Sequence, residues 1–143
     1  MKHEKVLSEK NEFGGKTVEF QYESGDREFE EGILKLVRFF DTQERLIRQE
    51  AYLDDKNPKY RGMRFLIEEL YDDGTLRKKT VYYSEDEMKK SWRSHEVFEF
   101  ERDGRLTKVE RHYGDLIPDN EPFRVVKMEF DSEGRISRVE CTY

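Results

Sequence analysis

Apolar and polar residues alternate along most of the chain, in short runs that turn-forming residues separate. In one example, residues 97–100 (Val-Phe-Glu-Phe) precede residues 102–104 (Arg-Asp-Gly), and a second alternating run follows at 106–109. Two β-rich runs around a turn-rich centre are typical of a β-hairpin. A three-residue loop with a type I turn and a G1 bulge needs a left-handed residue at its third position, which glycine adopts most easily. The pattern therefore predicts a hairpin in which Phe100 lies opposite Leu106.

The same pattern recurs with a period of thirty residues. An apolar residue precedes each turn, glycine or Glu44 stands at the third turn position, and an apolar and then a basic residue follow. These four columns are Phe40, Leu70, Phe100 and Phe130; Glu44, Gly74, Gly104 and Gly134; Leu46, Leu76, Leu106 and Ile136; Arg48, Lys78, Lys108 and Arg138. A fixed period of this length is the signature of a repeat architecture. We therefore predict four 30-residue hairpin repeats, at about residues 33–53, 63–83, 93–113 and 123–143. Because Glu44 replaces the glycine, we expect its turn to be strained or built differently.

Residues 1–32 fit this period poorly and are interpreted as a degenerate N-terminal cap of one domain, residues 1–143. Within the cap, residues 17–22 alternate as a further strand. Between the second and third hairpins, Ser84 and Glu87 form a capping box, with Ser84 as N-cap and Glu87 at the third helical position. We therefore expect one short helix near residues 85–92.

These elements predict an all-β fold, an antiparallel meander of about eight or nine strands. Carrying the turn pairing along the strands assigns the larger apolar side chains to one face, which we take as the core face. The expected cross-strand pairs on it are Ile33 with Leu53, Phe65 with Val81, Met63 with Tyr83, Val97 with Val109, Val125 with Cys141, and Phe123 with Tyr143. A one-sided apolar sheet needs a cover, which closure supplies. We therefore favour a curled or barrel-like meander, with an open single-layer repeat sheet as the alternative.

Composition limits the size of that core. Of the 143 residues 34% are apolar and 42% are charged, so a thick hydrophobic core is not expected. Disorder is not expected either, because 13% of the residues are aromatic and the net charge is only −6. The longest apolar runs are far shorter than the twenty residues of a membrane span. The N-terminus lacks the apolar stretch of a signal peptide, and the single Cys141 cannot form an internal disulfide. A cytoplasmic location is the expectation, although a removed leader would leave no trace.

Catalytic chemistry is not indicated by the titratable residues. The expected pairing puts His95 opposite Arg111 and His112 on the other face, so these histidines do not converge. Cys141 is expected on the core face, as a small apolar residue. Metal, phosphate-loop and nucleophile-elbow motifs do not occur, and no cofactor is expected. Nucleic acid is not an expected partner, because glutamates stand beside the basic column and the chain is acidic overall.

One apolar feature remains as a candidate site. Eight large side chains flank the four turns and form what we call the turn-side apolar row: Phe40, Leu46, Leu70, Leu76, Phe100, Leu106, Phe130 and Ile136. We expect this row on the face opposite the core face. If it is exposed, a patch of this size marks a partner surface. The other interpretation is a second small core, formed by coiling of the sheet or by cover from the segment of Met88 and Trp92.

The leading functional hypothesis is a non-enzymatic protein-interaction or scaffold module that uses the turn-side apolar row or a sheet edge. An oligomer is compatible with it. The alternative is a carrier of a small apolar ligand, bound inside a barrel under a lid that contains Met88 and Trp92. The bulky residues expected on the core face, among them Phe65 and Tyr83, argue instead for a filled interior.

Residues 100–106 (Phe-Glu-Arg-Asp-Gly-Arg-Leu) and 130–136 (Phe-Asp-Ser-Glu-Gly-Arg-Ile) resemble the aromatic, Asp, Gly-Arg-Leu core of YD/RHS-type repeats. Residues 70–76 (Leu-Tyr-Asp-Asp-Gly-Thr-Leu) are similar to the tyrosine-glycine hairpins of MORN-like repeat proteins. The resemblance covers residues 33–143. It implies an extended sheet of β-hairpins that serves as a scaffold, shell or interaction surface, and it brings no catalytic residues.

Overall fold

The computed structural model describes residues 3–114 and 124–143, and its strands form one ten-stranded antiparallel sheet. The strands are β1 (His3–Ser8), β2 (Gly14–Gln21), β3 (Ile33–Asp41), β4 (Leu46–Leu53), β5 (Met63–Leu70), β6 (Leu76–Tyr83), β7 (Arg93–Phe100), β8 (Leu106–Tyr113), β9 (Val125–Phe130) and β10 (Ile136–Thr142). Two short α-helices, α1 (Arg27–Glu30) and α2 (Glu85–Ser91), and a 3₁₀ turn η1 (Pro58–Tyr60) lie between strands. The expected all-β antiparallel meander is confirmed, and β1 is a strand that the capping segment was not expected to contain.

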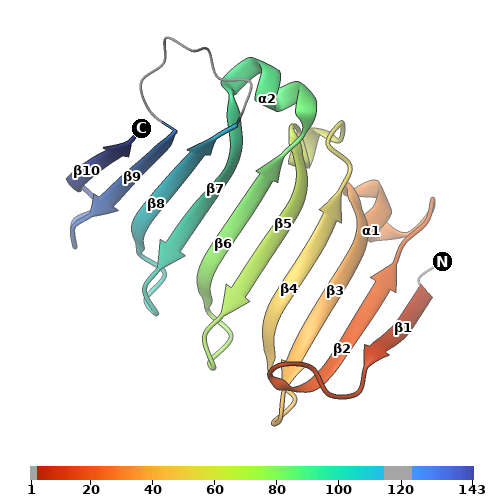
Figure 1. Ribbon diagram of the computed structural model, residues 1–143. Helices are drawn as coiled ribbons and strands as arrows, with labels where there is room; N and C mark the ends of the chain where they lie inside the picture. The colour runs from red at the N-terminus through yellow and green to blue at the C-terminus, as the bar shows by residue number, and fades with distance from the viewer. Residues whose placement is uncertain (1–2, 115–123) are drawn as a thin grey trace.

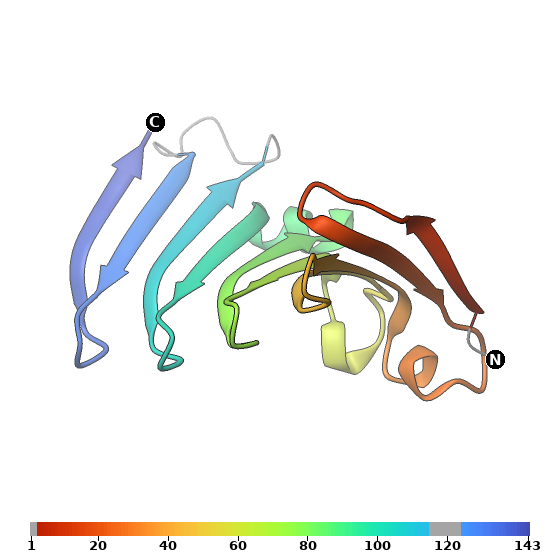
Figure 2. The ribbon, with the colours of Figure 1, turned by 90° about the horizontal axis from the view of Figure 1, so that it is seen from below.

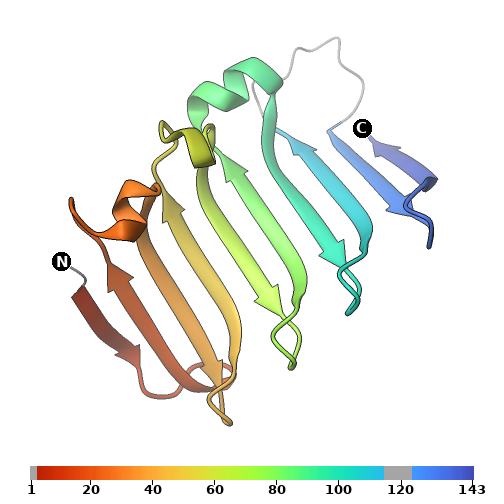
Figure 3. The ribbon, with the colours of Figure 1, turned by 180° about the vertical axis from the view of Figure 1, so that it is seen from behind.

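Each strand pairs only with its neighbours in the sequence, so β1 and β10 lie at opposite ends of the sheet (Figure 1). The sheet is arched and twisted but not closed into a barrel (Figure 2). The open single-layer sheet is therefore the architecture that forms. All three helical segments lie at one end of the strands, and the tight hairpin turns lie at the other (Figure 3). The expected helix near residues 85–92 is confirmed as α2, and the Ser84 hydroxyl accepts a hydrogen bond from the Glu87 backbone N–H at 3.2 Å.

The four hairpin turns have the expected geometry. Gly74, Gly104 and Gly134 have φ of 88°, 89° and 80°, the left-handed region that the G1 bulge needs. Glu44 adopts the same conformation, with φ of 60°, so its turn is built like the others and is strained. The Asp41 carboxylate stabilises that turn, because its Oδ1 accepts hydrogen bonds from the backbone N–H groups of Gln43 and Arg45 at 2.8 and 2.9 Å.

Unpaired bulge residues change the expected register inside the hairpins. Beside the turns, pairing skips Ile47, Arg77, Thr107 and Ser137, and at the other end it skips Leu34, Arg64 and Ser94. The end pairs Ile33 with Leu53 and Met63 with Tyr83 are confirmed. The pairs between the bulges are wrong by one residue, and the observed partners are Phe65 with Tyr82, Phe98 with Val109, and Val126 with Cys141. The expected pairing of Phe123 with Tyr143 lies outside the described residues.

This shift decides which side chains form the core, because a slip of one residue moves a side chain to the other face. We call the face that carries Leu36 and Val81 the core face and the opposite one the outer face. The buried apolar cluster consists of Leu36, Ala51, Leu53, Leu66, Val81 and Tyr83. Tyr60 of η1 and Met88 of α2 pack against it, so these two connectors cover the core face at one end of the strands. Phe65, which the sequence assigns to the core face, lies on the outer face beside Tyr82.

We expect opposite effects from two substitutions at equivalent turn positions. Gly104→Val should lower the free energy of unfolding by about 1–3 kcal/mol, because valine is strained at positive φ. Nothing lies within 4 Å of a Cβ built at Gly104, so steric clash does not contribute. Glu44→Gly should instead raise the free energy of unfolding by up to about 1 kcal/mol. Chemical denaturation measures both values, and a neutral Gly104→Val would contradict the assigned turn.

Candidate functional site

The turn-side apolar row lies on the core face and not on the opposite one. On β3, Phe40 lies four residues after the buried Leu36, so the two side chains are on the same face. Leu70, Phe100 and Phe130 likewise lie four residues after core-face positions on β5, β7 and β9. The expectation was wrong because the bulges beside the turns shift the faces by one residue. The row therefore borders the buried cluster at the end of the strands that is distant from the helices (Figure 1).

The row is neither fully buried nor fully exposed. Seven of its residues are half-buried and Ile136 is 56% exposed. Near the N-terminus, the β1–β2 loop reaches the row, where the Asn11 side chain donates from Nδ2 to the Phe40 carbonyl oxygen at 3.1 Å. An open depression of about 350 Å³ lies there, lined by Phe40, Gly14, Val18 and others. The described helices lie at the other end of the strands, so they do not cover the rest of the row.

Met88 and Trp92, the residues of the expected lid, have structural contacts of their own. Met88 packs against the buried cluster from α2. Trp92 ends that helix in the left-handed conformation, with φ of 64°, and its N–H donates to the Met88 carbonyl oxygen at 2.7 Å. Both residues lie at the helical end of the sheet, so Met88 and Trp92 do not form the cover over the turn-side apolar row.

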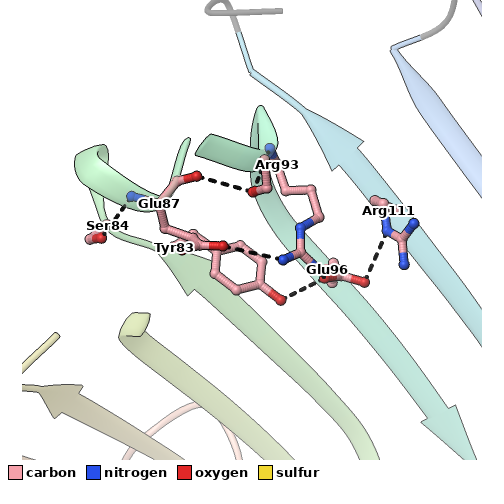
Figure 4. A network of polar contacts seen from close by, with 7 residues as sticks. Tyr83, Ser84, Glu87, Arg93, Glu96 and Arg111 are labelled. Carbon is pink, nitrogen blue, oxygen red and sulfur yellow. Dashed lines mark hydrogen bonds and ion pairs between the residues drawn. The ribbon is translucent and has the colours of Figure 1, made fainter. Parts of the chain in front are cut away.

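The carboxylate of Glu96, on β7, is buried on the core face beside β6 (Figure 4). Glu96 is 3% exposed and pairs with Val81 across the strands. Its Oε1 accepts hydrogen bonds from the Tyr83 hydroxyl and from Arg93 Nη1, both at 2.5 Å, and its Oε2 accepts one from Arg111 Nε at 3.2 Å. Two guanidinium groups therefore balance the buried charge. Burial, and then the Glu96 carboxylate, raise the pKa of Tyr83 far above its usual value.

The same network attaches helix α2 to the sheet. Arg93 stacks over the Tyr83 ring at 4.7 Å, and its Nη2 reaches Glu87 Oε1 of α2 at 3.4 Å. Glu87 also belongs to the capping box at Ser84, so the cap, the helix and the buried carboxylate are joined through Arg93. Because both Glu96 oxygens are occupied, the arrangement is typical of a structural ion cluster.

On the outer face, five rings form a continuous ladder across strands β4 to β8. They are Tyr52, Phe65, Tyr82, His95 and His112, with successive centroid separations of 4.8, 5.7, 5.2 and 4.1 Å. The two histidines were expected not to converge, with His95 opposite Arg111. That pairing is wrong, because the bulge at Ser94 places His95 directly opposite His112. A signal for the ladder exists in the sequence, since Tyr52, Tyr82 and His112 stand thirty residues apart.

The histidine pair has an electrostatic consequence. Burial, and then the neighbouring His112, lower the pKa of His95 below its usual 6.5. The His112 ring nitrogen Nε2 lies 2.7 Å from Glu110 Oε1. The ladder is therefore most stable while His95 is neutral.

The outer face also carries a row of alternating charges beside the turns. Successive strands from β4 to β10 contribute Arg48, Glu69, Lys78, Glu99, Lys108, Glu129 and Arg138, each opposite its neighbour. The alternation arises from glutamates on β5, β7 and β9, which the thirty-residue period alone did not connect with the basic column. Such exposed pairs contribute little individually, but they disfavour other registers.

Cys141 is exposed on β10, so its expected burial in the core is wrong. The reason is its position at the end of the sheet, beyond the buried cluster, where every residue of β10 is exposed. Among residues 3–114 and 124–143, no group of three or more metal-ligating side chains occurs. None of the helices in that part of the chain is long and apolar enough to cross a membrane.

No family model, curated protein or solved structure matches this chain. The resemblance to YD/RHS-type and MORN-like repeats therefore stays a prediction.

Substitution of the buried carboxylate should be costly. Glu96→Gln removes the carboxylate between Arg93 and Arg111 and leaves Arg93 its longer contact with Glu87, and we expect the free energy of unfolding to fall by about 2–3 kcal/mol. Glu99→Gln is the matched control on the same strand, because Glu99 lies on the outer face, 3.9 Å from Lys108 and 42% exposed. We expect less than about 1 kcal/mol for the control. Equal losses in urea denaturation would contradict the structural importance of the cluster.

Stability should also fall on acidification, in part through His95. Because folding lowers its pKa, the unfolded chain takes up a proton at a higher pH than the folded chain does. The stabilisation from neutral His95 is complete well above pH 6.5 and is lost as the pH falls below it. His95→Phe keeps a ring in the ladder without a titrating group. Denaturation at about pH 7.5 and 5.5 should show a smaller pH-dependent loss for this variant than for the wild type, and identical losses would contradict the assignment.

Proposed function

We propose that the protein is a non-enzymatic protein-binding module and that the turn-side apolar row is its binding surface. The observation that carries the proposal is that each hairpin has an apolar pair, largely half-buried, beside its turn, at the end of the strands away from the described helices. Eight adjacent strands with about 4.8 Å between neighbours make the row about 34 Å long. A continuous apolar strip of that length is typical of a partner surface.

The shape of the row favours one class of partner. It runs across the strands, so its side chains recur at about the strand spacing of 4.8 Å. An amphipathic helix presents apolar side chains once per turn, about 5.4 Å apart, and about 23 residues would span the whole row. We therefore propose an amphipathic helix of a protein partner, lying across the hairpins.

Two further observations support a binding role over the other hypotheses. The imidazoles of His95 and His112 are stacked in the ladder, and Glu96 is held between two arginines, so the groups suited to proton transfer have structural partners. The sheet is open, so it offers no barrel interior to an apolar ligand. For this reason we do not propose the carrier function.

Site-specific photo-crosslinking tests the proposal. A benzophenone amino acid replaces Ile136 in the row or, as a matched control, Leu7 on β1, which is 47% exposed. In lysate of the source cells, we expect a discrete crosslinked protein from position 136 and none from position 7. In an affinity capture of the same protein, the double variant Leu106→Ser/Ile136→Ser should retain at least tenfold less than the wild type. Unchanged capture by this variant, with its sheet signal intact in circular dichroism, would sink the proposal.

A further inference from the structure

Among residues 3–114 and 124–143, no strand pairs with the outer edge of β10, so this edge of the sheet is open. β10 pairs with β9 on one side, and all seven of its residues are exposed. The Thr142 carbonyl oxygen accepts a hydrogen bond from the Arg124 N–H, next to β9, at 2.7 Å. Backbone groups alternate in direction along an antiparallel strand, so Arg138 and Glu140 also turn theirs toward β9. Val139 and Cys141 therefore turn their N–H and C=O groups toward the open edge, which is an unpaired template for another strand.

The side chains along this edge follow the rule that orders the rest of the sheet. Two charge rows cross β8, β9 and β10 on the outer face with alternating sign, and an apolar row runs between them on the core face. The rows are Lys108, Glu129 and Arg138; Glu110, Lys127 and Glu140; and Val109, Met128 and Val139. The next strand in this order would carry an acidic residue opposite Arg138, an apolar one opposite Val139 and a basic one opposite Glu140.

A second copy of β10 that runs antiparallel to the first meets that requirement. We propose that the protein forms a two-fold symmetric dimer in which β10 pairs antiparallel with β10 of a second copy, with Val139 opposite Val139 on the axis. Arg138 then lies opposite Glu140 of the partner subunit, and Glu140 lies opposite Arg138 of the partner subunit. Both charge rows keep their alternation across the axis, and the two Val139 backbones exchange a pair of hydrogen bonds.

Other registers of the same pairing are less favourable. A dyad at Glu140 or at Arg138 sets each of these charges opposite itself, which destabilises a cross-strand pair. A dyad at Cys141 pairs Glu140 with Thr142 and leaves Arg138 without an opposite residue on β10. Only the register centred on Val139 forms two ion pairs and uses backbone groups that already point outward. In the single chain, Arg138 and Glu140 interact at 3.6 Å while 66% and 53% exposed, so both are accessible to a second copy.

This dimer meets the proposed partner surface at Ile136, the one residue of the turn-side apolar row that lies on β10. The dyad is perpendicular to the sheet, so both turn-side apolar rows stay on the same face. They lie at opposite ends of the strands, one in each half of a twenty-stranded sheet. A single strand pair buries less accessible surface than a standard protein interface, which buries about 1,600 Å². We therefore expect a reversible dimer with a Kd of about 10–100 μM.

Sedimentation velocity under reducing conditions tests the dimer, from about 5 to 500 μM protein. The wild type should change from monomer to dimer across this range. Arg138→Glu and Glu140→Arg should each weaken self-association at least tenfold, because each sets like charges opposite one another. An equimolar mixture of the two single variants should associate again, since one strand then carries two acids and the other two bases. Damage to the β9–β10 pairing within each chain cannot explain such a rescue, because mixing leaves it in place.

A backbone variant checks the edge without a change of charge. Val139→Pro removes an N–H that points away from β9, so the hairpin should fold while the dimer is lost. Val139→Thr is the matched control, a β-branched residue that keeps the N–H, and it should retain the dimer. A wild type that stays monomeric at 500 μM, a dimer that survives Val139→Pro, or mixed charge variants that fail to associate would overturn the proposal.

Discussion

The backbone register of the hairpins, set by unpaired residues near both ends, is the constraint on which both faces of the sheet depend. Between the bulge at Ile47 and the bulge at Leu34, pairing runs one residue out of step with the pairing at the hairpin ends. Without this offset Phe65 would face the core and Val81 would lie opposite it. With it, the aliphatic side chains gather on the core face, and the aromatic and imidazole rings form a ladder on the outer face.

A single-layer sheet cannot bury much apolar surface, and the structure compensates through contacts between adjacent strands. The apolar cluster is small, and the connectors between strands contribute Tyr60 and Met88 to its cover. Beyond it, the core face contains the charged cluster of Glu96, which joins three strands and helix α2 through hydrogen bonds. On the outer face, ring stacking and alternating charges connect each strand to the next. Because all of these contacts are between neighbours, the sheet resembles the linear systems in which stability is added unit by unit.

An architecture of this kind leaves surfaces that a closed barrel would remove. The turn-side apolar row lies beyond the described helices, and β10 keeps an edge of outward-pointing backbone groups. The two surfaces differ in chemistry, since the row is apolar and the edge is ordered by charge. This difference supports the two different occupants that we propose, an amphipathic helix of a partner and a second copy of this chain. A dimer would present two rows on one face, which would raise the avidity for a partner with two such helices.

Local signals in the sequence were sufficient for the four hairpins, for helix α2 and for their order, but not for β1, α1 or η1. Alternation, the turn glycines and the thirty-residue period predicted the hairpins, the pairs beside the turns and the all-β meander, and Ser84 with Glu87 predicted helix α2. The tertiary structure alone decided the faces, because a bulge depends on pairing between strands and changes no local pattern at Ser94 or Ile47. It therefore decided that His95 stacks on His112, that Glu96 is buried and that Cys141 is exposed. The tertiary structure also decided that the sheet does not close into a barrel, because the twist of the whole sheet sets whether the first and last strands can meet.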